Sequence, residues 1–410
     1  MSRIYLDHNA TTPAHPTALA AMVEASTHFF GNPSSLHAEG RAARQVLEKA
    51  RGEVALLIGA SPAEVLFTSG GTESNSTAIL GAARASARAR GRPGQLVSSP
   101  LEHPSVRSAL EQLQAEGFKL TWLPVDGRGG MDPAELRRLV SQEETALVSL
   151  ALVNHELGNL YPIAELCQLS HQYGALFHCD AVQAVGRVPL SVMELDVDLL
   201  SISSHKLFGP KGVGALFVRS RAASPTKAQR TPSLTTLSDM PPLLRGGAQE
   251  KGRRAGTENV PGIAGFGAAA ALCRREMLSR WAQVAALRDA LEARLLRIPG
   301  ARVHGDTKAS ARAPGTLNIA FSGVEGELLF MNLDLAGIAV STGAACSSGS
   351  PEPSAVLLAM GLERRQALEA IRISLGPENS AAELEQAAQA IEASVALVRA
   401  SGGPPAGQAR

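Results

Sequence analysis

Apolar runs alternate with helical patterns between about residues 62 and 218 of this chain. Several of these runs are apolar almost throughout, which is typical of strands covered by helices on both faces. Strand–helix alternation on this scale predicts an α/β fold with a mostly parallel, doubly wound sheet. The predicted strands cover residues 65–69, 95–99, 118–123, 146–153, 175–180, 198–203 and 214–218.

The pattern changes after residue 218. Residues 220–244 are rich in Pro, Ser and Thr without periodicity, which predicts a mobile loop. Further on, strands are predicted over residues 316–321, 337–341 and 371–375. A stripe of large apolar residues at helical spacing, which predicts a core-facing helix, consists of Trp281, Val284, Leu287, Leu291 and Leu295.

These patterns predict two domains. The large domain covers residues 15–262, and a smaller α/β domain combines residues 1–14 with residues 263–400. The last segment, residues 401–410, is predicted to be a disordered tail because it is short, terminal and rich in Gly and Pro.

Composition excludes several classes of protein. The chain has 410 residues and a formal net charge of +1, so no electrostatic argument favours nucleic acid. Aromatic residues make up 4% of the chain, which leaves few platforms on which bases could stack. No apolar run reaches the length of a membrane span, and no basic-then-apolar signal segment follows Met1. We therefore expect a cytoplasmic protein that binds neither nucleic acid nor membranes.

The cysteines argue against a structural metal site or a disulfide framework. None lies in a CxxC pair, and four cysteines are few for a chain of 410 residues. Cys167 falls in a helical pattern and Cys179 in a strand, so both are predicted to be buried small residues, and Cys273 is given no role. Cys346 differs, because STGAACSSGS (341–350) offers little bulk to bury a thiol. From these residues alone it is either a reactive nucleophile or a small turn residue.

Polar groups follow the ends of several predicted strands. Lys206, in SSHKLFGPKG, comes after one strand, Asp180 ends another with Gln183 three residues on, and His103 follows a third. The glycines of TSGGTESN (68–75) lie between a strand and a helix, a geometry that binds phosphate on free backbone N–H groups. Each feature alone has an ordinary explanation, such as a surface lysine or a glycine turn. Together they are the groups that pyridoxal 5′-phosphate needs: a lysine, a carboxylate for the pyridine nitrogen, a phosphate site and a flat ring.

The chain resembles the cysteine desulfurases of the iron–sulfur-cluster-assembly type, which are class-V-aminotransferase-like enzymes with the aspartate-aminotransferase-like fold (fold type I) of pyridoxal-phosphate enzymes. The resemblance covers nearly the whole chain, and its motifs follow in the family's order. They are YLDHNATTP (5–13), FGNPSSLHAEGRAAR (30–44), FTSGGTESN (67–75), EHPSV (102–106), HCDAVQAVG (178–186), SSHKLFGPKGVGALFV (203–218), RRAGTENVPGI (253–263), GVEGELLF (323–330), STGAACSSGSPEPSAVLLAMG (341–361) and IRISLG (371–376).

The resemblance implies a role for each matching residue. Lys206 would bind the cofactor covalently and move protons at the substrate's α-carbon, and Asp180 would pair with the pyridinium nitrogen. Gln183 would bond the ring's phenolic oxygen, and His103 would stack on the ring and help to move protons. The remaining implied contacts are Gly71, Thr72, Ser203 and His205 to the phosphate, Thr257 to the phosphate of a partner subunit, and Arg372 with Asn32 to the substrate carboxylate.

The resemblance also decides between the two interpretations of Cys346. In the family, the cysteine of this loop attacks the sulfur of the cysteine substrate, giving alanine and an enzyme-bound persulfide. The length of the loop from Cys346 to Pro353 is that of the iron–sulfur type, which implies transfer of sulfur to a scaffold or carrier protein. The implied assembly is a homodimer with shared active sites.

The chain departs from the family in three places. In VNHELGN (153–159), His155 stands where the family has a second Asn beside the ring's phenolic oxygen. We expect a shifted cofactor absorbance or an altered rate, unless neighbouring Asn154 takes over the contact. Ala355 replaces a histidine that often follows the catalytic loop, and the 220–244 loop is longer than usual, with no function assigned.

Three rival functions share parts of this pattern. A selenocysteine lyase has the same fold and can have a similar cysteine loop, so the sequence separates the two poorly. A plain aminotransferase would have no use for Cys346. A catalytically inactive sulfur-transfer scaffold would be expected to lack Lys206, Asp180 or Cys346, and all three are present.

Overall fold

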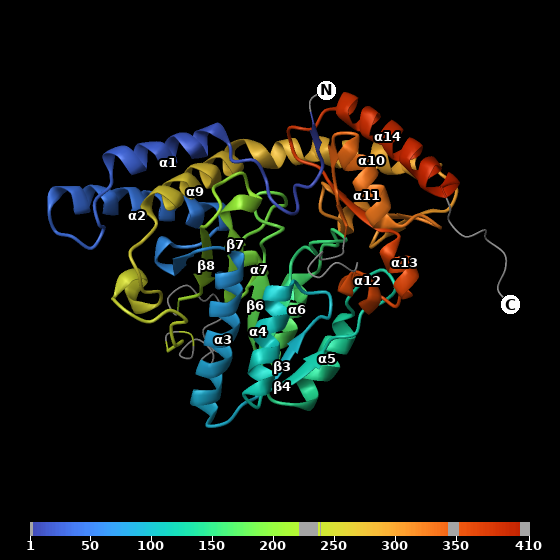
Figure 1. Ribbon diagram of the computed structural model, residues 1–410. Coiled ribbons are helices and arrows are strands. Elements are labelled where there is room, and N and C mark those ends of the chain that lie inside the picture. Colours follow the sequence, from blue (N-terminus) through green and yellow to red (C-terminus); the bar gives the residue numbers. More distant parts are fainter. Residues whose placement is uncertain (1–2, 221–236, 238, 343–351, 402–410) are drawn as a thin grey trace.

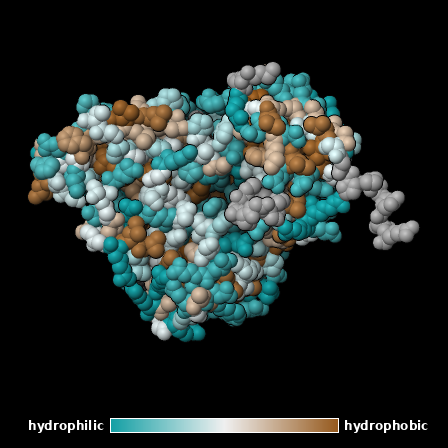
Figure 2. Space-filling view, viewed as in Figure 1, coloured by the Kyte–Doolittle hydropathy of each residue, from teal (hydrophilic) through white to brown (hydrophobic). Residues whose placement is uncertain are grey.

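The structure is a computed structural model, and it describes residues 3–220, 237, 239–342 and 352–401. Most of the predicted 220–244 loop, all but one residue of the predicted tail, and Cys346 therefore lie outside the described residues. None of the helices in these ranges is both long enough and apolar enough to cross a membrane. Figure 2 shows hydrophilic residues over most of one face, with apolar residues in small scattered groups.

A seven-stranded sheet forms the centre of the molecule (Figure 1). Its strand order is β2-β8-β7-β6-β5-β3-β4, and β8 alone runs in the opposite direction to the other six strands. The predicted mostly parallel sheet is therefore confirmed, with each strand within two residues of its predicted bounds. The strands are β2 (Val65–Thr68), β3 (Gln95–Ser98), β4 (Lys119–Trp122), β5 (Thr145–Ala151), β6 (Leu176–Asp180), β7 (Leu199–Ser203) and β8 (Gly214–Val218).

Helices cover both faces of this sheet, which explains why its strands are apolar throughout. Neighbouring residues of one strand enter different cores: Leu176 of β6 packs with α3 and α4, and Phe177 packs on the opposite side. Asp132 caps α5, because its side chain accepts a hydrogen bond from the Ala134 N–H at the start of that helix. The connecting helices are α3 (Gly71–Arg90), α4 (Pro104–Ala115), α5 (Pro133–Gln142), α6 (Ile163–Gln172) and α7 (Val192–Leu195).

Three long helices form a layer beside the sheet: α1 (Pro16–His28), α2 (Ala38–Ile58) and α9 (Val260–Leu272). Helix α9 packs against both α1 and α2, and the three lie together in Figure 1. A single π-helical turn, Cys273–Met277, joins α9 to α10 (Leu278–Leu295). The boundary that we predict at residues 262/263 falls within α9, and the division into domains stays a prediction.

A second, four-stranded antiparallel sheet has the order β12-β13-β10-β9. The strand predicted over 337–341 is two short strands, because β11 pairs with β1 whereas β12 pairs with β13. The two-residue strand β1 and the partly exposed β9 were not predicted, since neither carries an apolar run. The four strands of this sheet are β9 (Ala301–His304), β10 (Thr316–Phe321), β12 (Ser341–Thr342) and β13 (Ala370–Ser374). A separate parallel pair consists of β1 (Ile4–Tyr5) and β11 (Ile338–Ala339).

Helices pack against this second sheet as the apolar stripe predicts. Trp281, Val284, Leu291 and Leu295 of α10 are buried, and Leu287 packs partly buried against the same core. The predicted core-facing helix is confirmed. The other helices of this region are α11 (Gly326–Leu335), α12 (Ala355–Ala359), α13 (Arg364–Leu368) and α14 (Ala381–Ala400).

Phe266 of α9 provides a test of how the helical layer is attached to the central sheet. Its ring is fully buried and meets Phe67 of β2 edge-on, with 6.3 Å between ring centroids. We expect Phe266→Ala to lower the free energy of unfolding by about 3–5 kcal/mol, measured by urea denaturation. Phe30 is 74% exposed, so Phe30→Ala should change the same quantity by less than about 0.5 kcal/mol. Equal effects of the two variants would contradict this packing.

Candidate active site

A pocket of about 250 Å³ lies at the carboxyl ends of the central parallel strands. Strands β5, β6 and β7 end at Ala151, Asp180 and Ser203, and all three residues line it. Open α/β sheets bind ligands at this edge because loops diverge there. The other lining residues are Ala10, Gly71, Thr72, Asn75, His103, Ser105, Val153, His155, Val182, Gln183, His205 and Lys206. Nine of the predicted site residues are thus brought together.

Lys206 lies in a short helical turn directly after β7. Its Nζ donates hydrogen bonds to the backbone carbonyls of Asn9 and Ala10, at 2.8 Å for the latter. Burial lowers the pKa of the amine to about 7, with the positive charges of Arg187 and Arg372 acting in the same direction. A large fraction of this lysine is therefore uncharged at neutral pH, as a nucleophilic amine must be.

Asp180 is almost completely buried and held on both sides. Its Oδ1 accepts the N–H of Val182 at 2.9 Å, and its Oδ2 accepts the side-chain amide of Asn75 at 2.8 Å. Hydrogen bonds to the charged form of a carboxylate favour that form. Asn75 was not predicted from the sequence, although it lies one helical turn beyond the glycines of TSGGTESN and thus on the face of α3 that starts at the pocket.

Two imidazoles face each other across the pocket. His103 caps α4, accepting the Ser105 N–H at 3.1 Å, and its ring meets His155 edge-on, with 5.3 Å between centroids. Burial is the main cause that lowers the pKa of both rings, and the charge of Lys206 adds to it. Asp180 opposes the shift at His103. Both rings are therefore uncharged at neutral pH, which suits stacking and proton acceptance.

His155 occupies its place because Asn154 is engaged elsewhere. The Asn154 side chain accepts the backbone N–H groups of Glu156 and Leu157, each at 2.9 Å, and donates to the carbonyl of Leu101 at 3.0 Å. All three contacts fix the turn after β5. Asn154 is therefore not free to take over the contact of the residue beside it, and the pocket receives an imidazole.

The amino end of α3 forms an anion-binding side of the pocket. Gly70 and Gly71 begin the helix, so its first backbone N–H groups point into the space beside Thr72. A Cβ at Gly71 would lie 2.8 Å from Val182, so glycine is needed for this close approach. The hydroxyl of Ser203 is buried next to it, with no hydrogen-bond partner among the described residues.

Glu73 ties this helix end to a distant loop. Its carboxylate accepts the Ser69 N–H at 2.7 Å and pairs with Arg254 at 2.9 Å, which lowers its pKa although burial acts in the opposite direction. Arg254 belongs to the loop of Thr257. Thr257 itself is exposed and does not line this pocket, and neither does the exposed Asn32.

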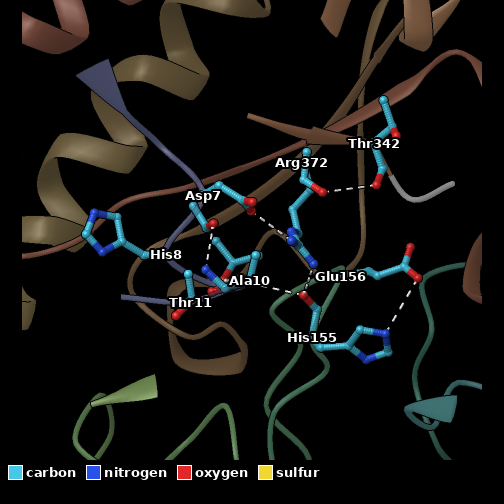
Figure 3. Close-up of polar contacts among 12 residues, drawn as sticks. Asp7, His8, Ala10, Thr11, His155, Glu156, Thr342 and Arg372 are labelled. Atoms are coloured by element: carbon cyan, nitrogen blue, oxygen red, sulfur yellow. Dashed lines mark hydrogen bonds and ion pairs between the residues drawn. The ribbon is translucent and has the colours of Figure 1, made fainter. Parts of the chain in front are cut away.

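Arg372 of β13 does not line the pocket itself but contacts the pocket residue His155 (Figure 3). Its guanidinium donates to the backbone carbonyl of His155 at 3.1 Å and to the Asp7 carboxylate at 2.9 Å. Its Nε is buried with no partner among the described residues. Asp7 was not predicted, because nothing in the sequence places residue 7 beside residue 372.

Asn9, which was not predicted, makes hydrogen bonds to several residues of the site. Its carbonyl accepts Lys206 and Gln183, the latter at 2.9 Å, and its side-chain amide donates to the His155 carbonyl at 3.1 Å. Its side-chain oxygen accepts the guanidinium of Arg187. Gln183 keeps its Oε1 without a partner among the described residues, so this oxygen can still accept from a ligand.

The remaining cysteines play no part in the pocket. Cys167, Cys179 and Cys273 are buried, as predicted for the first two, and burial raises the pKa of Cys179 and Cys273. In the described ranges, no group of three or more His, Cys, Asp or Glu side chains could hold a metal ion. The groups that are present could instead hold a flat, phosphate-bearing cofactor that reacts with an amine.

Comparison with known proteins assigns the family. The aminotransferase class-V family model matches residues 4–387. A cysteine desulfurase of Cereibacter sphaeroides is 45% identical over 403 residues, which are 98% of this chain and 97% of that protein. The chain belongs to the cysteine desulfurase family of class-V aminotransferases.

Solved structures agree with this assignment. A NifS-like protein superimposes with a TM-score of 0.84 at 34% identity, covering 96% of this chain and 100% of that one. A structure named SspA in complex with cysteine superimposes with a TM-score of 0.76 at 29% identity, covering 92% and 100%. The predicted fold type I architecture of a cysteine desulfurase is thus confirmed.

The lowered pKa of Lys206 predicts a pH dependence of stability. Its pKa is about 7 in the folded chain and near 10.4 when unfolded, so between these values the unfolded chain binds more protons. Stability from this group must therefore rise with pH in that window, and below pH 7 the full penalty is present. We measure the free energy of unfolding of cofactor-free protein by urea denaturation at pH 7 and pH 9. Between these values it should rise in the parent chain by more than about 1 kcal/mol beyond any rise in Lys206→Met. Parallel pH profiles would contradict the shift.

Proposed function

We propose that this protein is a pyridoxal-phosphate-dependent cysteine desulfurase that converts L-cysteine to L-alanine and leaves the sulfur as a persulfide on Cys346. The observation that carries the proposal is the convergence of a buried Lys206, whose pKa is lowered, and a hydrogen-bonded Asp180 in one pocket of a chain that also has the loop STGAACSSGS. Its relatives are named cysteine desulfurases, and one neighbouring structure is named as a complex with cysteine.

The residues present fit pyridoxal 5′-phosphate. The buried hydroxyl of Ser203 and the Oε1 of Gln183 lack partners among the described residues, as expected of groups that await a ligand. Thr72, His205 and the amino end of α3 would hold the phosphate, and Asp180 would pair with the ring nitrogen. When bound, the cofactor supplies an electron sink for the bonds at the substrate's α-carbon.

The chain's own residues then position the substrate and move its protons. Arg372 would bind the substrate carboxylate, for which its unpartnered Nε offers a further donor beside the contact with Asp7. Lys206, a large fraction of which is uncharged at neutral pH, would take the proton from the α-carbon, and His103, whose pKa is lowered by burial, would assist. His155 would stand next to the phenolic oxygen, and an altered cofactor absorbance stays a prediction.

Cys346 would perform the sulfur step. Its thiolate attacks the sulfur of the substrate, so that an S–S bond forms and the C–S bond of the substrate breaks. The electron pair of the broken bond stays with the substrate's β-carbon, which takes up a proton and leaves as part of alanine. The terminal sulfur of the persulfide is then transferred to an acceptor, for which we propose an iron–sulfur scaffold or another carrier protein.

The assembly that fits this function is a cytoplasmic homodimer with shared active sites. Thr257 and Asn32 support it, since both side chains are exposed and outside the pocket of their own chain. The Glu73–Arg254 ion pair fixes the loop of Thr257 to the amino end of α3. From there Thr257 would reach the phosphate of the partner subunit, and Asn32 its substrate.

The proposal is tested by incubating the cofactor-loaded protein with L-cysteine. Alanine and sulfide should form, and mass mapping should find the persulfide on Cys346. Cys346→Ala should keep the cofactor absorbance and lose at least about 10²-fold in rate. Cys167→Ala is the matched control, because this buried thiol has no proposed role, and it should keep both rate and persulfide.

Three results would contradict all or part of the proposal. Turnover of selenocysteine without turnover of cysteine would indicate a selenocysteine lyase. Absence of cofactor absorbance after reconstitution, with no alanine formed, would indicate an inactive sulfur-transfer scaffold. Full-rate desulfuration by Cys346→Ala would leave the enzyme class intact but remove the proposed nucleophile.

A further inference from the structure

Arg187 is a buried cation next to the pocket that the mechanism above does not use. It is 5% exposed and follows the turn after β6. No carboxylate pairs with it among the described residues, where its partners are the side-chain oxygen of Asn9, the His8 carbonyl at 2.8 Å and the Lys206 carbonyl at 3.5 Å. Its guanidinium carbon also lies 5.7 Å from the ring centroid of Trp281.

A buried charge without a counter-ion is unfavourable. Hydrogen bonding to Asn9 and His8 therefore does not by itself explain why this residue is an arginine. A neutral donor could make the same hydrogen bonds to Asn9 and His8 without this penalty. Burial and the charge of Arg372 lower the pKa of Arg187 to about 10, so it remains a cation at neutral pH. What a cation adds is repulsion of other cations nearby.

Lys206 is the neighbouring group on which the positive charge of Arg187 would act. Arg187 contacts the lysine's own backbone carbonyl, and both side chains bind the same residue, Asn9, from different sides. We propose that Arg187 is a positioning residue for Lys206: through Asn9 it orients the amine, and its unpaired charge makes protonation of that amine unfavourable.

Other charged groups also face Lys206, and they define what Arg187 contributes. After burial, Arg187 is the largest influence that lowers the lysine's pKa, followed by Arg372 of β13. Asp7 of the amino-terminal segment and Asp180 of β6 oppose them. His103 of α4, His155 after β5 and the adjacent His205 all have lowered pKa values and add little positive charge at neutral pH. Without Arg187, two carboxylates, Asp7 and Asp180, and one arginine, Arg372, would remain as the charged groups that act on Lys206.

The proposal rests on the proposed role of Lys206, and its test does not require turnover. The full-length chain without cofactor is labelled with acetic anhydride at a series of pH values, and the Lys206 peptide is quantified by mass spectrometry. Arg187→Gln keeps a donor for Asn9 but removes the charge, so the apparent pKa of Lys206 should rise by about one unit or more, toward its ordinary value. Arg187→Lys keeps the charge and should hold the pKa near that of the parent chain.

Arg219 provides the matched control. It is also a buried arginine of the central sheet region, donates to backbone carbonyls at 2.7 and 2.8 Å, and lies 5.6 Å from the ring of Phe217. Arg219→Gln should leave the pKa of Lys206 unchanged. The proposal is overturned if Arg187→Gln leaves this pKa unchanged, or if Arg219→Gln raises it equally.

A second measurement covers the case in which Arg187→Gln folds poorly. Arg187→Lys alone, loaded with cofactor, should show the same pH titration of the cofactor absorbance as the parent chain, since the charge is retained. A shift of that titration by about one unit in this variant would also overturn the proposal. Because labelling of Lys206 is read without substrate, a failed desulfurase assay would count against the proposed function and not against this role of Arg187.

Discussion

The active site depends on the amino-terminal segment that runs between the two sheets. Ile4 and Tyr5 pair with β11, and Asp7 forms a bridge to Ser374 of β13 in the second sheet. Asn9 of the same segment holds Lys206 and Gln183, which follow strands of the first sheet. A segment that binds both sheets couples their positions, so the lysine and Arg372 are fixed relative to each other through one short stretch of chain. Without it, two groups that must act on one substrate would lie on separately packed parts of the molecule.

Electrostatics is the second constraint, and it acts mainly through burial. Arg187 and Arg372 are positive groups near Lys206, while Asp7 and Asp180 are the carboxylates that face the lysine. The excess of positive charge is tolerable because the histidines around the pocket are uncharged at neutral pH. The same excess would attract an anionic substrate and a phosphate-bearing cofactor. The buried positive charges therefore lower the stability of the folded chain, and the same charges favour binding and reactivity at this site.

The central sheet and the pocket residues at its strand ends could be predicted from the sequence, because apolar runs and parallel topology together place strand ends at one edge. Lys206, Asp180, His103 and Gln183 follow from that rule. Asp7, Asn9 and Arg187 could not be predicted, since the contacts that bring them to the site, such as Asn9 with Arg187 and Asp7 with Arg372, join residues 178 and 365 positions apart and carry no local pattern. The split of the strand at 337–341 was missed for the same reason: it reflects a choice between two partner strands, which periodicity does not encode.

We propose Lys206 as the residue through which this chain binds pyridoxal 5′-phosphate, and the other proposed roles depend on it. The most direct measurement is reduction of the cofactor-loaded protein with borohydride, which fixes an amine-bound cofactor in place, followed by peptide mass mapping. A pyridoxyl group is expected on Lys206, and it should be absent from Lys206→Met. A label on another lysine, with Lys206 unmodified, would contradict the account.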